Sequence, residues 1–236
     1  MNFMVRPSKS FLFDVLEAKL SKIRGEVGLD AACADFKNHR MFKTEKYFGL
    51  DIDLDALRSG LTKPNTENSW GIFGSLTKID SLPENSIDVV VSTNTIYHLS
   101  SADRLVALKN LCRLVAPSGI FLCDLPVDKD FNDGLAILQS NFNQLEVIYY
   151  KNIFSRIYEK IFEKDGYLGS HPIAGLRPFR LLAWLISRLE FLTKNLKSNK
   201  KQVFIICSDK KNTGRKNTFD LFGFSQIDEK IFKVDK

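Results

Sequence analysis

Two acidic residues, each at the end of a short apolar segment, are the most informative feature of this sequence. Asp30 follows residues 27–29 and opens the small-residue turn Ala31-Ala32-Cys33-Ala34. Asp51 follows a second such segment, residues 46–50, about 20 positions further on. In α/β sheets a tight turn lets backbone N–H groups approach a ligand, and an acid at this distance accepts hydrogen bonds from both ribose hydroxyls. The spacing therefore indicates an adenosine-containing cofactor.

Each of these acids also has a structural interpretation. Asp51 is close enough to a helix expected at residues 54–61 to cap its first turn, although the preceding Gly49 and the spacing favour ribose binding. Asp30 is either an ordinary acid at the end of a strand or the partner of an ammonium group at the far end of the cofactor. Both alternatives stay open at the level of sequence.

Apolar segments that alternate with helical patterns surround these acids. Such alternation predicts a doubly wound, mostly parallel seven-stranded α/β sheet within a single domain of residues 1–236, with an α-helical insertion before the last strand. The continuous apolar segment 87–93 is typical of a central strand that is covered on both faces. The expected strands are 27–30, 46–51, 70–74, 87–93, 120–125, 145–150 and 203–208, and the expected helices of the main domain are 11–24, 54–61, 101–115 and 131–140.

The order of these segments resembles that of the class I S-adenosylmethionine-dependent methyltransferases. Phe48-Gly49-Leu50-Asp51 resembles the end of that family's second strand, Leu82 to Val90 the approach to its fourth strand, and Leu111 to Gly119 the turn before its fifth. The resemblance covers roughly residues 25–150 and 201–208. It implies S-adenosylmethionine as the cofactor and a contact set that consists of Asp30, Ala32, Ala34, Asp51, Ile52, Ser75, Leu76 and Asn94.

The first motif departs from that family in its glycines. Ala32, Ala34 and Phe36 stand where the family has glycine, and alanine fits such a turn where φ stays negative. The segment Asp35 to Arg40 resembles members that act on sugars and lipids. The expected acceptor is therefore a small molecule or a glycolipid, methylated on oxygen.

Further candidates follow the expected strand 87–93. His98 is the first candidate for a catalytic base, with helix packing as its alternative role. Asn94 is followed by Thr95 and not by the prolines of the motif used on exocyclic amines, which disfavours nucleobase methylation. Ser75 and Asp80 compete for contact with the adenine ring.

Residues 151–200 hold ten basic and four acidic residues, and the rest of the chain is neutral, so this insertion carries the whole net charge of +6. An excess confined to an insertion argues against a nucleic-acid-binding protein. In the helix expected at residues 179–197, Leu182, Leu185, Ile186 and Leu189 form a wide apolar sector that contains Arg188. The insertion is expected to be a lid, a contact to an anionic membrane surface, or a contact to a protein partner.

Composition narrows the remaining possibilities. Four widely spaced cysteines indicate buried free thiols, and three isolated histidines predict no metal site. Without a long apolar run or a signal sequence, the expected location is the cytoplasm, including the inner membrane surface. The alternative to an enzyme is a relative that has lost cofactor binding and acts as a binding module. A nicotinamide dehydrogenase is disfavoured because its turn requires glycine more strictly. Nothing in the sequence specifies an oligomeric state.

Overall fold

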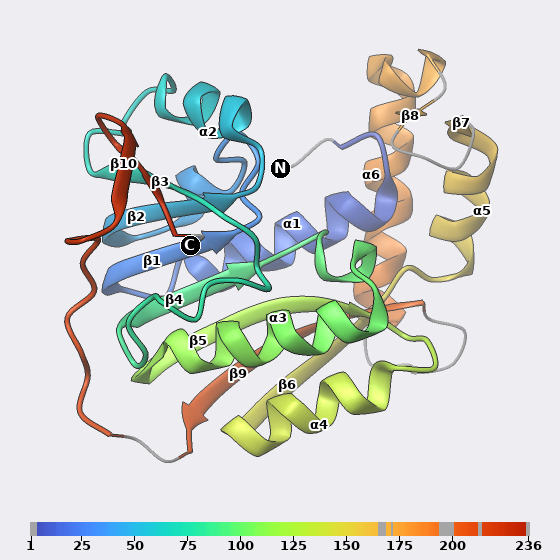
Figure 1. Ribbon diagram of the computed structural model, residues 1–236. Helices are drawn as coiled ribbons and strands as arrows, with labels where there is room; N and C mark the ends of the chain where they lie inside the picture. Colours follow the sequence, from blue (N-terminus) through green and yellow to red (C-terminus); the bar gives the residue numbers. More distant parts are fainter. Residues whose placement is uncertain (1–3, 165–168, 171, 194–200, 212–213, 235–236) are drawn as a thin grey trace. The chain divides into compact units, whose positions relative to one another are not determined.

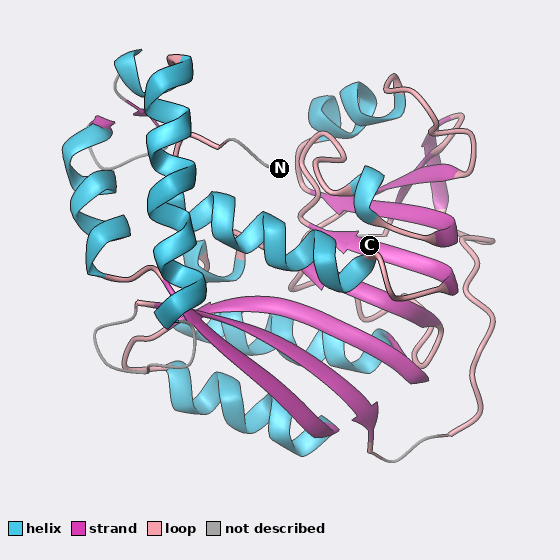
Figure 2. Cartoon of the chain, turned by 180° about the vertical axis from the view of Figure 1, so that it is seen from behind, coloured by secondary structure: helices cyan, strands magenta, loops and turns pink. Residues whose placement is uncertain are grey.

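A computed structural model describes residues 4–164, 169–170, 172–193, 201–211 and 214–234 of the chain. The chain divides into two compact units. The helical unit comprises residues 1–19, 126–128 and 147–204, and the sheet unit comprises residues 20–125, 129–146 and 205–236. The insertion expected at residues 151–200 thus groups with the N-terminal helix. Figures 1 and 2 show the elements of both units.

Every strand of the main sheet has residues in the sheet unit. The strand order is β10-β11-β3-β2-β1-β4-β5-β9-β6 (Figure 1). Strand β1 pairs in parallel with both β2 and β4, so the strand order reverses at β1. The strands are β1 Gly25–Ala31, β2 Thr44–Asp51, β3 Ser69–Phe73, β4 Ile87–Ser92, β5 Val115–Pro126, β6 Phe142–Tyr150, β9 Gln202–Lys210, β10 Ser225–Asp228 and β11 Ile231–Lys233.

The α/β class and the mostly parallel sheet agree with the sequence prediction, but the strand number does not. The sheet has nine strands and not seven, because the C-terminal segment adds β10 and β11 beside β3. Strand β11 pairs in parallel with β3, and its Ile231 is buried opposite Gly71. The signal for these strands is weak because they are short and interrupted by charges. Pairing with the edge of β3 stabilises them.

The helices of the sheet unit lie close to their expected positions. They are α2 Leu54–Leu61, α3 Ser101–Leu114 and α4 Phe131–Asn141, of which α3 and α4 pack side by side on one face of the sheet (Figure 1). Ser100 caps the start of helix α3, because its hydroxyl accepts a hydrogen bond from the Asp103 N–H. As predicted, the central strand β4 buries Val89, Val90 and Val91 almost completely.

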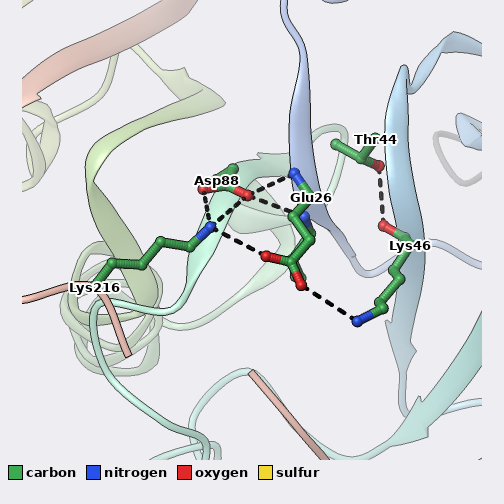
Figure 3. A network of polar contacts seen from close by, with 6 residues as sticks. Glu26, Thr44, Lys46, Asp88 and Lys216 are labelled. Carbon is green, nitrogen blue, oxygen red and sulfur yellow. Dashed lines mark hydrogen bonds and ion pairs between the residues drawn. The ribbon is translucent and has the colours of Figure 1, made fainter. Parts of the chain in front are cut away.

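Two lysines near the end of β9 and after it, Lys210 and Lys216, make contacts that support the sheet. Lys210 is the last residue of β9, and its buried amine donates to the carbonyl oxygen of Val115 at 2.6 Å. Lys216 pairs with Asp88 at 2.8 Å, and the Asp88 carboxylate also accepts the N–H groups of Glu26 and Val27 (Figure 3). This network joins the first residues of β1 and β4. It therefore lies at the amino ends of the strands and stabilises the sheet there.

The described residues of the helical unit form three α-helices. These are α1 Pro7–Leu20, α5 Ile153–Phe162 and α6 Arg177–Thr193, with the short elements β7 Glu163–Lys164, β8 Gly169–Ser170 and η3 Pro172–Gly175 between α5 and α6. Helix α1 begins four residues before its expected start, because Pro7 suits a first helical turn, and it ends before the residues that lead into β1. The part of the predicted helix 179–197 beyond residue 193 lies outside the described residues.

Candidate cofactor site

The candidate site lies at the carboxyl ends of the parallel strands β1, β2 and β3. Ligands bind at this edge of open α/β sheets, beside the point where the strand order reverses. A pocket of about 80 Å³ opens there, and it is lined by residues from all three strand ends and from the segment after β4. Its lining residues are Ala32, Leu50, Asp51, Ile52, Gly74, Ser75, Leu76, Thr95 and Leu99.

Five of the eight residues predicted to contact the cofactor line this one pocket: Ala32, Asp51, Ile52, Ser75 and Leu76. Asp30, Ala34 and Asn94 do not line it. Four lining residues were not predicted as contacts: Leu50 and Gly74, each next to a predicted contact, and Thr95 and Leu99, both within five residues of Asn94. Topology therefore brings together residues more than 60 positions apart in the chain.

The turn after β1 keeps a backbone suited to glycine although it contains none. The φ angles of Ala32, Ala34 and Phe36 are 61°, 50° and 60°. The condition under which alanine fits such a turn without strain, a negative φ, is therefore not met at Ala32 and Ala34. A left-handed conformation costs a residue with a Cβ about 1–2 kcal/mol. The turn keeps this backbone at the expense of local strain, and the N–H groups of Ala32 and Cys33 donate to the Leu50 carbonyl.

The ring of Phe36 explains how the turn accommodates its largest departure from the family pattern. Phe36 is buried and packs edge-on against Tyr47, with 5.0 Å between the ring centroids. A Cβ built on Gly49 would lie 2.4 Å from Cε1 of this ring, and one built on Gly60 would lie 2.6 Å from its Cδ1. The two glycines, on β2 and α2, thus leave the space that the phenylalanine side chain fills.

Asp51 holds the turn against the end of β2. Its Oδ2 accepts the Ala34 N–H at 2.7 Å, and its Oδ1 accepts the Asp53 N–H at 3.0 Å. Asp51 does not cap α2, because that role belongs to Asp53, whose Oδ1 accepts the Ala56 N–H. A carboxylate oxygen has room for about two hydrogen bonds. Each oxygen of Asp51 can therefore accept one further donor, as two ribose hydroxyls require.

Asp30 lies in the interior of the sheet unit, fully buried. Its Oδ1 accepts from the Asn38 side-chain amide and its Oδ2 from the Tyr47 hydroxyl, both at 3.0 Å. Burial raises the pKa of the Asp30 carboxyl above its usual range, while the nearby Lys37 ammonium opposes this shift. These two internal donors give Asp30 a structural role, in which it joins the segment after the turn to β2.

The segment after β4 supplies the opposite wall of the pocket. Asn94 has a φ of 59°, a conformation that asparagine tolerates well, and its N–H donates to Asp124 Oδ1 at 2.7 Å. Nearby, the Lys37 amine donates to the Thr93 carbonyl at 3.2 Å. His98 is exposed, with its ring centroid 4.1 Å from that of Tyr97, and it does not line the pocket, although Thr95 and Leu99 on either side of it do.

Of the two candidates for contact with an adenine ring, Ser75 is the one that lies at the pocket. Its hydroxyl lies 2.9 Å from the hydroxyl of Thr77. Asp80 is exposed and does not line the pocket. The four cysteines are buried free thiols, as predicted, and burial raises the pKa of each of them. Among the described residues, no group of three or more histidine, cysteine or acidic side chains is arranged to hold a metal ion.

Comparison with known proteins agrees with this geometry. Residues 29–123, which run from the end of β1 through most of β5 and contain all the residues that line the pocket, match a family described as a methyltransferase domain. This match confirms the predicted resemblance to the S-adenosylmethionine-dependent methyltransferases over residues 29–123. No curated protein matches the chain in sequence.

Solved structures share the fold of this methyltransferase domain at low sequence identity. The N-methyltransferase NodS from Bradyrhizobium japonicum, solved with S-adenosyl-L-homocysteine, has a TM-score of 0.54 at 10% identity, with 85% of each chain covered. The [4+2]-cyclase SpnF has a TM-score of 0.53 at 12% identity, with 87% of this chain and 82% of that chain covered. Phosphoethanolamine N-methyltransferase 2 of Haemonchus contortus has a TM-score of 0.51 at 13% identity, with 84% of this chain and 52% of that chain covered. Since a cyclase shares the fold, the fold alone does not specify the reaction.

Proposed function

We propose that this methyltransferase domain uses S-adenosylmethionine to methylate a hydroxyl of a small-molecule or glycolipid acceptor. The observation that carries the proposal is the single pocket formed by Ala32, Asp51, Ile52, Ser75 and Leu76 at the carboxyl edge of the sheet. The cofactor supplies a methyl group already activated on a sulfonium. The main task of the protein is therefore to align the acceptor with that methyl group and to exclude water.

The residues of the pocket suit an adenosine group. Asp51 retains one acceptor position on each carboxylate oxygen for the ribose hydroxyls. Beside it, Ile52 is an apolar side chain with 70% of its surface exposed, although it lines the pocket. An exposed isoleucine at this point offers an apolar surface for a planar ring, and covering it would remove apolar area from water.

Oxygen is the proposed methylated atom because of the residues after β4. A hydroxyl acceptor benefits from a base, and His98 is an exposed histidine on the segment that also supplies Thr95 and Leu99 to the pocket. Asn94 is followed by Thr95 and Ile96, so the proline-containing motif for nucleobase amines is absent from this segment. The resemblance of residues 35–40 to members that act on sugars and lipids supports the acceptor class.

Titration calorimetry with S-adenosylhomocysteine tests the cofactor step without knowledge of the acceptor. We expect the full chain to bind with a Kd in the micromolar range or below, roughly −8 kcal/mol. Replacing Ile52 by serine removes apolar contact worth about 1 kcal/mol, so the Kd rises about fivefold. Because Ile52 is exposed, the melting temperature of I52S remains that of the wild type.

Val106→Ser is the matched control, since Val106 is another exposed β-branched residue, on α3, and does not line the pocket. The Kd of V106S should equal that of the wild type. Absence of heat with the wild-type chain at millimolar ligand contradicts the proposed function. Equal weakening in both variants would refute the assignment of Ile52 to the cofactor pocket.

A second candidate is a non-catalytic relative that has lost cofactor binding. One observation favours it: the pocket holds only about 80 Å³, whereas ligand pockets usually hold about 300 Å³ or more. The same titration separates the two functions, because a non-catalytic relative gives no heat with S-adenosylhomocysteine.

A further inference from the structure

Helices α5 and α6 of the helical unit bury polar residues and expose apolar ones. Ser155, Glu159, Ser187 and Glu190 are each at most 3% exposed. The apolar stripe, by contrast, consists of eight residues that are between 43% and 81% exposed. Its members are Ile153, Phe154, Ile157 and Ile161 on α5, and Leu181, Leu182, Leu185 and Leu192 on α6.

The buried polar residues hold this arrangement in place. Oε1 of Glu190 on α6 accepts the Asn152 N–H at 2.6 Å and the Ser155 hydroxyl at 2.7 Å. Glu159 on α5 accepts the Ser8 N–H at 3.2 Å and pairs with Lys151 at 3.2 Å. Each carboxylate therefore has internal donors. Turning either helix to bury its leucines or isoleucines would leave these donors and acceptors without partners.

The two halves of the apolar stripe lie on one side of the helix pair. Helices α5 and α6 run antiparallel, because Ser155 meets Glu190 while Tyr158, a turn later on α5, donates to the Phe179 carbonyl at the start of α6 (Figure 1). At about 100° per residue, the stripe on α5 is rotated away from the face that contacts α6, and the stripe on α6 is rotated by a similar angle away from the face that contacts α5. In an antiparallel pair, equal rotations place both stripes on the same side.

The charge exposed by these helices is positive. Glu159 and Glu190, the two acidic residues of α5 and α6, are buried, whereas Lys160, Arg177 and Arg180 are exposed and Arg156 is half-buried. Arg188, which falls within the apolar sector expected from sequence, pairs with Asp14 on α1 and lies 4.8 Å from the centre of the Trp184 ring. The surface around the apolar stripe is thus both apolar and cationic.

We infer that the apolar stripe and its basic neighbours bind an anionic lipid surface, with α5 and α6 lying in the interface. Apolar residues beside basic ones are the pattern by which helices lie in a headgroup layer. A second copy of the chain is the alternative occupant, and the test below distinguishes it from a lipid surface. No helix among the described residues is long and apolar enough to cross a bilayer, which is consistent with a surface mode.

Flotation of the full chain with vesicles tests this inference. Vesicles of phosphatidylcholine alone are compared with vesicles containing 30% phosphatidylserine (about the charge of an anionic leaflet), each at low and at high salt. We expect the protein to float with the anionic vesicles at low salt and to be released at high salt. Arg177→Gln with Arg180→Gln should weaken binding about fivefold for each charge removed.

Apolar variants complete the test. Ile157→Ser with Leu185→Ser should weaken binding at least tenfold, whereas Val106→Ser on α3 leaves it unchanged. Circular dichroism establishes that each variant is folded. The inference is overturned if the folded wild-type chain stays in the unbound fraction when it is mixed with anionic vesicles at low salt. It is also overturned if neutral vesicles bind equally, or if light scattering shows a lipid-free dimer that I157S/L185S abolishes. Cofactor titration reports on the proposed function separately.

Discussion

The turn at residues 31–36 and the helix pair α5–α6 depart from sequence expectation in opposite ways. In the turn, the side chains differ from the family pattern, yet the backbone keeps φ values of 50–61° at the positions where that pattern has glycine. In the helix pair, the amphipathic pattern is clear, yet the polar side is buried and part of the apolar side is exposed.

This comparison shows that the residues packed against each region determine the backbone conformation of the turn and the buried face of the helices. Phe36 keeps a left-handed backbone because Gly49 and Gly60 leave room for its ring. Glu190 is buried because Asn152 and Ser155 present donors to it. In both regions the deciding residues lie more than ten positions away in the chain, where local patterns carry no information about them.

The largest effect on stability is expected from a variant that removes the buried hydrogen bonds of the helix pair. Glu190→Ala leaves the Asn152 N–H and the Ser155 hydroxyl without their acceptor, so we expect the free energy of unfolding to fall by about 3 kcal/mol. Leu185→Ala on the same helix, at an exposed position, should change it by less than about 0.5 kcal/mol. Urea denaturation of both variants measures the contrast. A larger loss in L185A than in E190A would show that the leucine face is the buried one.

An intermediate effect tests how the turn accommodates Phe36. Gly49→Ala places a Cβ 2.4 Å from the ring and 2.8 Å from the Cys33 sulfur, so we expect a loss of about 2 kcal/mol. Gly214→Ala is the control, since its Cβ would meet nothing nearer than Asn85 Nδ2 at 3.7 Å. Thermal and urea unfolding provide the measurement.

The same variant can show whether Gly49 and Phe36 act as a pair. If they do, the combined variant Phe36→Leu with Gly49→Ala should be less destabilised than the sum of the two single variants. If the losses of stability in the two single variants simply add, the packing of the Phe36 ring does not depend on the absence of a side chain at residue 49.

The smallest effect measures the strain in the turn itself. Ala34→Gly relieves a φ of 50°, and this gain exceeds the added freedom of the unfolded chain, so the variant should be more stable by about 0.5–1 kcal/mol. Ala56→Gly, the same substitution within α2, should cost about 1 kcal/mol. Opposite signs in urea denaturation establish the strain. A loss of stability in both variants would mean that the turn is not strained at Ala34.

The sequence by itself determined the order of the strands β1 to β6 and β9 and of the α-helices, the parallel α/β class and the edge at which the pocket forms. These follow from short-range signals: apolar segments of strand length, the Ser100 cap, and the rule that parallel strands bring their carboxyl ends to one edge. For the same reason the positions of Ala32, Asp51, Ile52, Ser75 and Leu76 around one pocket were predictable.

Only the tertiary structure decided the conformation of the turn, the partners of Asp30, the added strands β10 and β11, and the buried side of α5 and α6. Each of these depends on groups distant in the chain: Gly60 beside Phe36, Tyr47 on Asp30, β3 beside β11, and Glu190 beside Ser155. A helical pattern specifies that two faces differ. Which face is buried depends on the hydrogen-bond donors and the free volume that the rest of the fold presents to it, because a buried polar group is stable only where it has a partner.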